Sequence, residues 1–180
     1  SLAINAALTG HLVLSTLHTN SAAAAPARLL DMGVEPFLLV STLRVVIGQR
    51  LVRRLTPEKE KHALSRDEQS QLDHLIDAGA VLRALKEEKA VAPAAVWKNI
   101  PFCGPKESAE APSGYQGRVG IHEVLPITGS IKELIMGNHT ADDIEAQARK
   151  EGMLTMAEDG IFKAAEGITS IEEVLRVITE

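Results

Sequence analysis

The pattern of apolar positions near the start of the chain predicts a strand between two helices. Residues 12–17 form a nearly continuous apolar and β-branched run, which is typical of a strand covered on both faces in a parallel sheet. Small apolar residues at 2–8 predict a helix before this run. Cap-type residues at 19–21 predict a helix over 22–31 after it, ended by Gly33. These elements indicate an α/β protein.

The next segment repeats its apolar residues at a helical spacing. Pro36 suits the first turn of a helix, and apolar residues recur at every fourth position from Leu39 to Leu51. This spacing predicts a long, mostly buried helix over 37–54. Together with the elements before it, this helix completes a first predicted domain at 1–55.

Residues 56–113 differ in character from the segments on either side. They contain charge runs, amphipathic stretches at 65–78 and 81–89, and then sequence interrupted by prolines. These features predict a mostly helical insertion. Apolar and polar residues alternate again at 114–127, which predicts a returning strand.

The remainder of the chain carries repeated helix-start signals. A hydroxyl residue is followed three positions later by an acid at Thr140, Thr155 and Ser170, which is the spacing of a capping box. Glycines at 137, 152 and 167 are placed to close the preceding helices. We therefore predict a C-terminal helical subdomain over 128–180.

Composition and charge narrow the class of protein. The chain has 180 residues, of which 45% are hydrophobic, and a formal net charge of −5, which is typical of a soluble globular protein. The acidic balance argues against direct nucleic-acid binding. The single Cys103 excludes an internal disulfide, and no apolar run is long enough for a transmembrane segment.

Two histidines flank the apolar run. His11 precedes it and His18 follows it, and the alternation of side chains along a strand argues against a metal site shared between them. Ligands of open parallel sheets bind beyond the carboxyl ends of the strands, where His18 and the polar residues around it would lie. His18 is therefore the better candidate for a ligand-facing residue, with an ordinary surface role still open, whereas the residues around His11 favour an ordinary structural or surface role.

Candidate phosphate-binding residues are arginines rather than a glycine-rich loop. The first 55 residues are net basic, with arginines at 28, 44, 50, 53 and 54, but ordinary surface arginines explain most such sets. The chain contains neither a Gly-x-x-x-x-Gly-Lys-Ser/Thr phosphate loop nor a dinucleotide-binding fingerprint. We therefore expect that it cannot hold a triphosphate by itself.

Several segments together resemble one family of molecular motors. They resemble the histidine box and the motifs that follow it in the secretion and pilus-assembly ATPases, the hexameric motors of type II secretion and type IV pili. The matching segments are residues 6–20, 30–37, 49–55, 114–123, 152–155 and 158–160. The resemblance implies the C-terminal half of a RecA-like P-loop ATPase domain, starting just after the Walker B motif, and hence a fragment of a longer chain.

The resemblance also implies roles for individual residues. His11 and His18 match the histidine pair thought to sense or stabilise the γ-phosphate, and Arg50 and Arg118 match residues near the nucleotide. ATP and Mg²⁺ would be bound by the intact parent protein. Because the phosphate loop and the Walker B acids are absent, we expect no hydrolysis by this chain alone.

The insertion departs from the family pattern. Many relatives hold zinc there with two Cys-x-x-Cys pairs, whereas the matching positions here are Thr56, Lys59, Cys103 and Lys106. A lysine ammonium cannot coordinate zinc, so we expect no zinc ion and a segment held by helix packing instead. In relatives this region is associated with the inner-membrane platform.

Our hypothesis from the sequence is a motor fragment that acts in the cytoplasm, peripheral to the inner membrane. Its expected partners are the other subunits of a homohexamer and the platform and cytoplasmic-ring proteins of a secretion or pilus machine. The alternative is a non-enzymatic assembly or docking module of such a machine. The motifs do not distinguish secretion from pilus assembly or DNA uptake.

Overall fold

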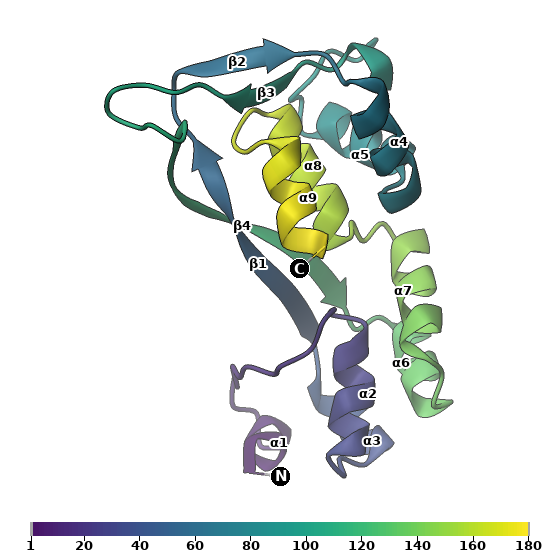
Figure 1. Ribbon diagram of the computed structural model, residues 1–180. Coiled ribbons are helices and arrows are strands. Elements are labelled where there is room, and N and C mark those ends of the chain that lie inside the picture. Colours follow the sequence, from purple (N-terminus) through teal and green to yellow (C-terminus); the bar gives the residue numbers. More distant parts are fainter. Residues whose placement is uncertain (1, 180) are drawn as a thin grey trace. The chain divides into compact units, whose positions relative to one another are not determined.

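The computed structural model describes residues 2–179, which form helices and two small sheets (Figure 1). The helices are α1 (Leu2–Leu8), α2 (Ala24–Asp31), α3 (Pro36–Thr42), α4 (Arg66–Leu75), α5 (Ala78–Glu87), the 3-10 helix η1 (Trp97–Asn99), α6 (Gly129–Met136), α7 (Ala141–Lys150), α8 (Met156–Ala165) and α9 (Ile171–Thr179). The strands are β1 (Val45–Leu55), β2 (Lys59–His62), β3 (Phe102–Pro105) and β4 (Tyr115–Pro126). The predicted α/β class is thus confirmed as a mixture of helices and small sheets. In the described part of the chain, no helix is both long and apolar enough to cross a membrane.

The contacts divide the chain into two compact units. Unit 1 contains residues 2–48 and 123–153, and unit 2 contains residues 49–122 and 154–179. The paired strands β1 and β4 contribute residues to both units. In unit 2, Thr56 N donates to Gly114 O (3.1 Å), and in unit 1, Ile127 N donates to Arg44 O (2.9 Å). These two bonds show that β1 and β4 run antiparallel.

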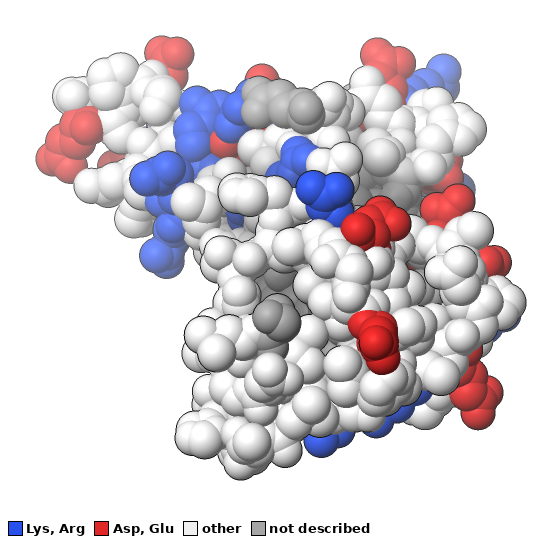
Figure 2. Space-filling view, turned by 90° about the horizontal axis from the view of Figure 1, so that it is seen from below, with Lys and Arg blue, Asp and Glu red and all other residues white. Residues whose placement is uncertain are grey.

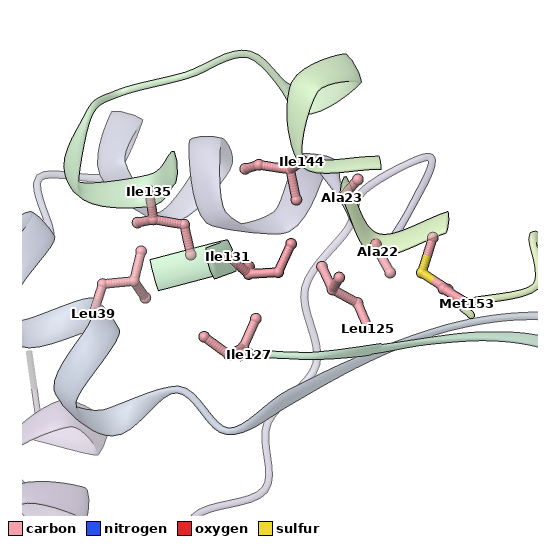
Figure 3. Close-up of a cluster of buried hydrophobic side chains, with 10 residues drawn as sticks. Ala22, Ala23, Leu39, Leu125, Ile127, Ile131, Ile135, Ile144 and Met153 are labelled. Atoms are coloured by element: carbon pink, nitrogen blue, oxygen red, sulfur yellow. The ribbon is translucent and has the colours of Figure 1, made fainter. Parts of the chain in front are cut away.

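Unit 1 is held together by an apolar core at the end of β4 (Figure 3). Leu125 and Ile127 come from this end of the chain's last strand, and they pack with Leu39 of α3 and with Ile131 and Ile135 of α6. Leu125 and Ile131 are fully buried. The core therefore fixes α3 and α6 to this end of β4 through apolar contacts.

Unit 2 has its own core beneath the paired strands β2 and β3. The two strands are antiparallel, with Lys59 opposite Pro105 and His62 opposite Phe102. The fully buried Phe102 ring packs in a cluster with residues of α4, α5, α8 and α9. The Trp97 ring meets it edge to face at a centroid distance of 5.9 Å. The short β2–β3 strand pair is therefore packed against an apolar core.

Most of the predicted helix ends are confirmed. Thr140 and Thr155 form reciprocal capping boxes with the acids three residues later, and Ser170 Oγ accepts from Glu173 N (3.2 Å). Gly33 has a φ of +83°, as expected of a glycine that follows a helix. The amphipathic stretches at 65–78 and 81–89 correspond to α4 and α5, and the strand predicted at 114–127 is β4.

The strand predicted at 12–17 is wrong. These residues form neither helix nor strand, and Leu12 and Leu14 are 89% and 87% exposed. A strand requires a neighbour for its backbone hydrogen bonds. No segment in residues 2–179 pairs with this run, so the expected parallel sheet is not formed.

The long helix predicted over 37–54 is also wrong, because α3 ends at Thr42 and β1 follows. A four-residue spacing fits one side of a helix, but it also fits one face of a strand, where side chains repeat every two residues. The β-branched residues at 45–47 favour the strand, and Gly48 disfavours a helix. Ile47 and Leu51, expected in the core, are 58% and 45% exposed.

The helices at 128–180 are present, but they do not form one subdomain. Helices α6 and α7 belong to unit 1, whereas α8 and α9 belong to unit 2. The insertion, predicted to be mostly helical, contains the strands β2 and β3 as well as α4 and α5. Residues 59–62 are mainly charged, so the alternation that signals a strand is missing from β2.

A buried carboxylate joins α9 to β1 within unit 2. The side chain of Glu173 is fully buried and accepts from Arg53 N (2.9 Å), from the Arg53 guanidinium (2.7 and 2.9 Å) and from Arg176 (2.8 and 3.1 Å). The Arg53 guanidinium also lies 4.2 Å from the centre of the Tyr115 ring. Burial alone would raise the pKa of Glu173, but the hydrogen bonds from Arg176 and Arg53 outweigh it and lower the pKa to about 2.

This network predicts an acid-sensitive stability. A carboxyl whose folded pKa lies below its unfolded value stabilises the fold above the unfolded pKa, and this stabilisation is lost as the pH falls toward the folded value. Urea unfolding between pH 6 and pH 2 should show a loss of up to about 3 kcal/mol attributable to Glu173, reduced by solvent screening of the half-exposed arginines. Glu173→Gln should flatten this dependence. An equally steep dependence in that variant would contradict the assignment.

Candidate functional site

His11 is tied to the end of α1. Its Nδ1 lies 3.0 Å from Thr9 Oγ1 and 3.3 Å from Ala6 O, and Thr9 Oγ1 donates to Ala6 O (2.9 Å). These contacts are local and give the ring a role in ending the helix. They fit an ordinary structural role for His11, and a role at a phosphate stays a prediction.

His18 has a different environment, because it lies exposed at the far end of the extended run. Within residues 2–179, its ring makes no hydrogen bond or ion pair. Both ring nitrogens are therefore available to a ligand, as donor or acceptor according to the tautomer. Of the two predicted histidines, His18 has the geometry of a ligand-facing group.

The segment that carries His18 is anchored just beyond it. Ala22 N donates a short hydrogen bond to Glu123 Oε1 of β4, and Ala24 N donates to Ser21 Oγ (3.2 Å). Ala22 and Ala23 are buried in the core of unit 1, beside Leu125 (Figure 3). The backbone is thus fixed four residues after His18.

Our sequence analysis missed Glu123. A usable signal was present, because β4 buries every second residue at 121, 123 and 125, and an acid occupies the middle position of this row. A carboxylate among buried apolar positions requires a partner, which points to a structural or functional role.

The two predicted arginines differ in whether their side chains make hydrogen bonds within the structure. Arg50 of β1 is half-buried and donates a short hydrogen bond to Val177 O in α9. Arg118 of β4 is exposed, and its side chain makes no hydrogen bond or ion pair with any residue that the structure describes. It follows Gly117, whose φ of +75° is the geometry of a glycine in a β-bulge. Arg118 is therefore the better candidate for an anion contact.

The structure places the four predicted site residues in two groups, one in each unit. The histidines lie in unit 1 and the arginines in unit 2. Unit 1 also exposes apolar side chains along β1 and around residues 11–18, which we call the histidine segment. Figure 2 shows a broad area without charged residues. The exposed large apolar residues of unit 1 are Leu2, Leu8, Leu12, Val13, Leu14, Met32, Phe37, Val45, Ile47, Val124 and Met136. Such a surface is unusual for a complete monomeric protein.

The four positions matching the family's zinc site lie around one end of the β2–β3 strand pair, but their side chains do not fit zinc. Lys59 Nζ donates to Gly167 O (2.6 Å), which ties β2 to the loop after α8. A Cβ built on Gly167 would lie 2.9 Å from Lys59 Nζ and 3.1 Å from Cys103 Sγ, so both side chains pack against this glycine. An ammonium and one buried thiol cannot form a tetrahedral zinc site. In the described part of the chain, no group of His, Cys, Asp and Glu residues is arranged to hold a metal ion.

Comparison with known proteins gives a consistent family. The family model described as "Type II/IV secretion system protein" matches residues 1–176. Type II secretion system protein E of Xanthomonas campestris pv. campestris is 45% identical over 177 residues, covering 98% of this chain and 28% of that protein.

Two further relatives show the same partial coverage. The type IV pilus assembly ATPase PilB of Myxococcus xanthus is 38% identical over 174 residues, covering 97% of this chain and 28% of the relative. The type II secretion system ATPase E of Vibrio cholerae is 39% identical over 182 residues, covering 99% and 32%. The chain therefore spans about a third or less of the length of these relatives.

The packing around Gly167 predicts a large effect of a small substitution. Gly167 has a φ of +71° and is in close contact with Lys59 and Cys103, so Gly167→Ala combines backbone strain with a steric clash. We expect the free energy of unfolding to fall by about 2 kcal/mol or more. Gly129→Ala is the control, because Gly129 has open space around its Cα and no positive φ. Equal stability of the two variants in urea titrations would contradict this packing.

Because the side chains at the zinc-site positions do not fit zinc, we predict that chelators leave the thermal stability unchanged. If Lys59 and its hydrogen bond to Gly167 do what a metal does in other proteins, EDTA should leave the thermal midpoint unchanged, and added zinc should not raise it. Differential scanning fluorimetry with and without EDTA measures this directly. A midpoint that drops with EDTA and recovers with zinc would show that a metal is bound after all.

Proposed function

The chain belongs to the family of type II/IV secretion system proteins, and from this premise we propose that it is the C-terminal part of a hexameric ATPase that drives type II secretion or type IV pilus assembly. The names of the relatives support this proposal, since they include both a type II secretion ATPase and a type IV pilus assembly ATPase. The family model and these relatives cover nearly all of the chain, so the relationship does not rest on a short motif.

In this proposal the chain supplies part of a nucleotide site. His18 faces the γ-phosphate of ATP, where a donor aimed at the developing charge stabilises the transferred phosphoryl group. Arg118 contributes a cation near the nucleotide. The supporting observation is that both side chains are exposed and have no partner in the described structure.

His11 and Arg50 have weaker support as nucleotide contacts. The His11 ring already contacts Thr9 and Ala6, and the Arg50 guanidinium already donates to Val177 O. To reach a phosphate, each would have to exchange a local hydrogen bond for a contact with the ligand. We therefore assign the principal roles to His18 and Arg118.

The remainder of the site would come from other parts of a longer protein. A phosphate loop and acids that hold Mg²⁺ are required for ATP hydrolysis, and this chain has neither motif. When bound, Mg²⁺ would neutralise charge on the phosphates.

The assembled protein would act in the cytoplasm, peripheral to the inner membrane, as a homohexamer. Its proposed partners are the inner-membrane platform and the cytoplasmic-ring proteins of the secretion or pilus machine. A second candidate function is a docking module without ATPase activity, and the exposed apolar surface of unit 1 favours it to the extent that this surface binds a partner protein.

Substitution of His18 separates the two functions. In the full-length protein, His18→Ala should lower kcat for ATP on the order of 100-fold, because one donor to the developing charge is lost. The matched control is His74→Ala, which removes an exposed histidine of α4 in unit 2. Steady-state phosphate release measures both variants. Unchanged turnover with His18→Ala in a folded protein would favour the docking module.

A further inference from the structure

Glu123 is a buried acid whose position calls for an explanation. It is 7% exposed, and Oε1 accepts a hydrogen bond from Ala22 N, 101 residues away in the sequence. Placing a carboxylate in a protein interior is unfavourable unless donors compensate the lost hydration. A glutamate here therefore serves a contact that an apolar residue could not make.

The neighbouring strand leaves space for this carboxylate. A Cβ built on Gly48 of β1 would lie 2.7 Å from Glu123 Cγ and 2.8 Å from Oε1, which is closer than real Cβ contacts allow. Only a glycine at position 48 lets the side chain of Glu123 lie against β1. Gly48 and Glu123 thus act together in holding Ala22.

Ala22 is the point at which the histidine segment re-enters the core. Ala22 and Ala23 are 1% and 2% exposed, whereas the residues from 11 to 16 and His18 itself are exposed. Only three residues separate His18 from Ala22. The backbone next to His18 is therefore set by one hydrogen bond and one patch of core packing.

We infer that Glu123 is a positioning residue, which fixes His18 relative to β4 by accepting the Ala22 N–H hydrogen bond beside Gly48. The inference rests on the proposed function, because it assigns Glu123 a role in the placement of a phosphate contact. Glu123 acts through Ala22, which lies four residues along the chain from His18, and not on the substrate. Misplacing a catalytic group by about 1 Å can lower a rate on the order of 100-fold.

The first test measures, in the full-length protein, the hydrogen bond from Ala22 N to Glu123. Hydrogen–deuterium exchange of peptides covering residues 19–24 should become faster in Glu123→Ala, because Ala22 N loses its acceptor. Glu123→Gln keeps an acceptor oxygen and should restore much of the protection. If Glu123→Ala does not fold, Glu123→Asp replaces it, since its shorter side chain withdraws the carboxylate from Ala22. Unchanged exchange at 19–24 in a folded variant would overturn the inference.

The second test asks whether this hydrogen bond affects the rate of ATP turnover. Glu123→Ala should lower kcat for ATP at least about tenfold while KM changes by less than about threefold, and Glu123→Gln should recover most of the rate. Ile135→Ala is the control for simple destabilisation, because Ile135 lies in the same core and packs near Leu39, away from the histidine segment (Figure 3). An equal loss of kcat in Ile135→Ala would show that Glu123 is merely structural.

His18→Ala, measured alongside, separates this inference from the proposed function. If His18→Ala lowers kcat and Glu123→Ala does not, positioning by Glu123 is wrong and the phosphate role of His18 stands. If neither substitution changes kcat in a folded protein, the proposed function fails, and the inference fails with it.

Discussion

Buried carboxylates that accept backbone N–H groups hold the separate segments of this chain together. Glu123 accepts from Ala22 N, Glu158 accepts from Asp77 N (2.9 Å) and Glu173 accepts from Arg53 N (2.9 Å). Each bond joins elements more than eighty residues apart and lies within one unit. A buried acid left without such donors would be strongly unfavourable, so each contact specifies one arrangement of its two segments. With an aromatic content of 3% and no disulfide, the chain relies on this polar specification in addition to its apolar cores.

The same contacts explain why some residues are held and others are left free. His11 and Arg50 satisfy their hydrogen bonds within their own units, whereas the His18 and Arg118 side chains are exposed and make no hydrogen bond within residues 2–179. His18 is followed by the Glu123 anchor, and Arg118 lies on a strand whose other residues pack against α9. An exposed polar side chain without a partner suits the phosphate contact that we propose for His18 and Arg118. The family membership and this arrangement point to the same use.

The sequence predicted local features better than long-range ones. Helix starts at Thr140 and Thr155 were correct, because a capping box depends only on residues three positions apart. The helix over 37–54 was wrong because a four-residue repeat suits both a helix and a strand, and the pairing with β4 decides between them. The strand at 12–17 was wrong because no partner strand is present among the described residues. The motifs predict His18 and Arg118 as site residues, and this stays a prediction, whereas no local pattern contains the contact of Glu123 with Ala22.

The central claim is that this chain carries part of an ATPase site whose other residues lie elsewhere in a longer protein. Steady-state ATP turnover with magnesium tests it most directly, measured at matched concentrations on the 180-residue chain and on a longer chain that adds the upstream phosphate loop. The account predicts turnover by the longer chain only. Turnover by the 180-residue chain alone would contradict the divided site, and no turnover by either would contradict the motor function.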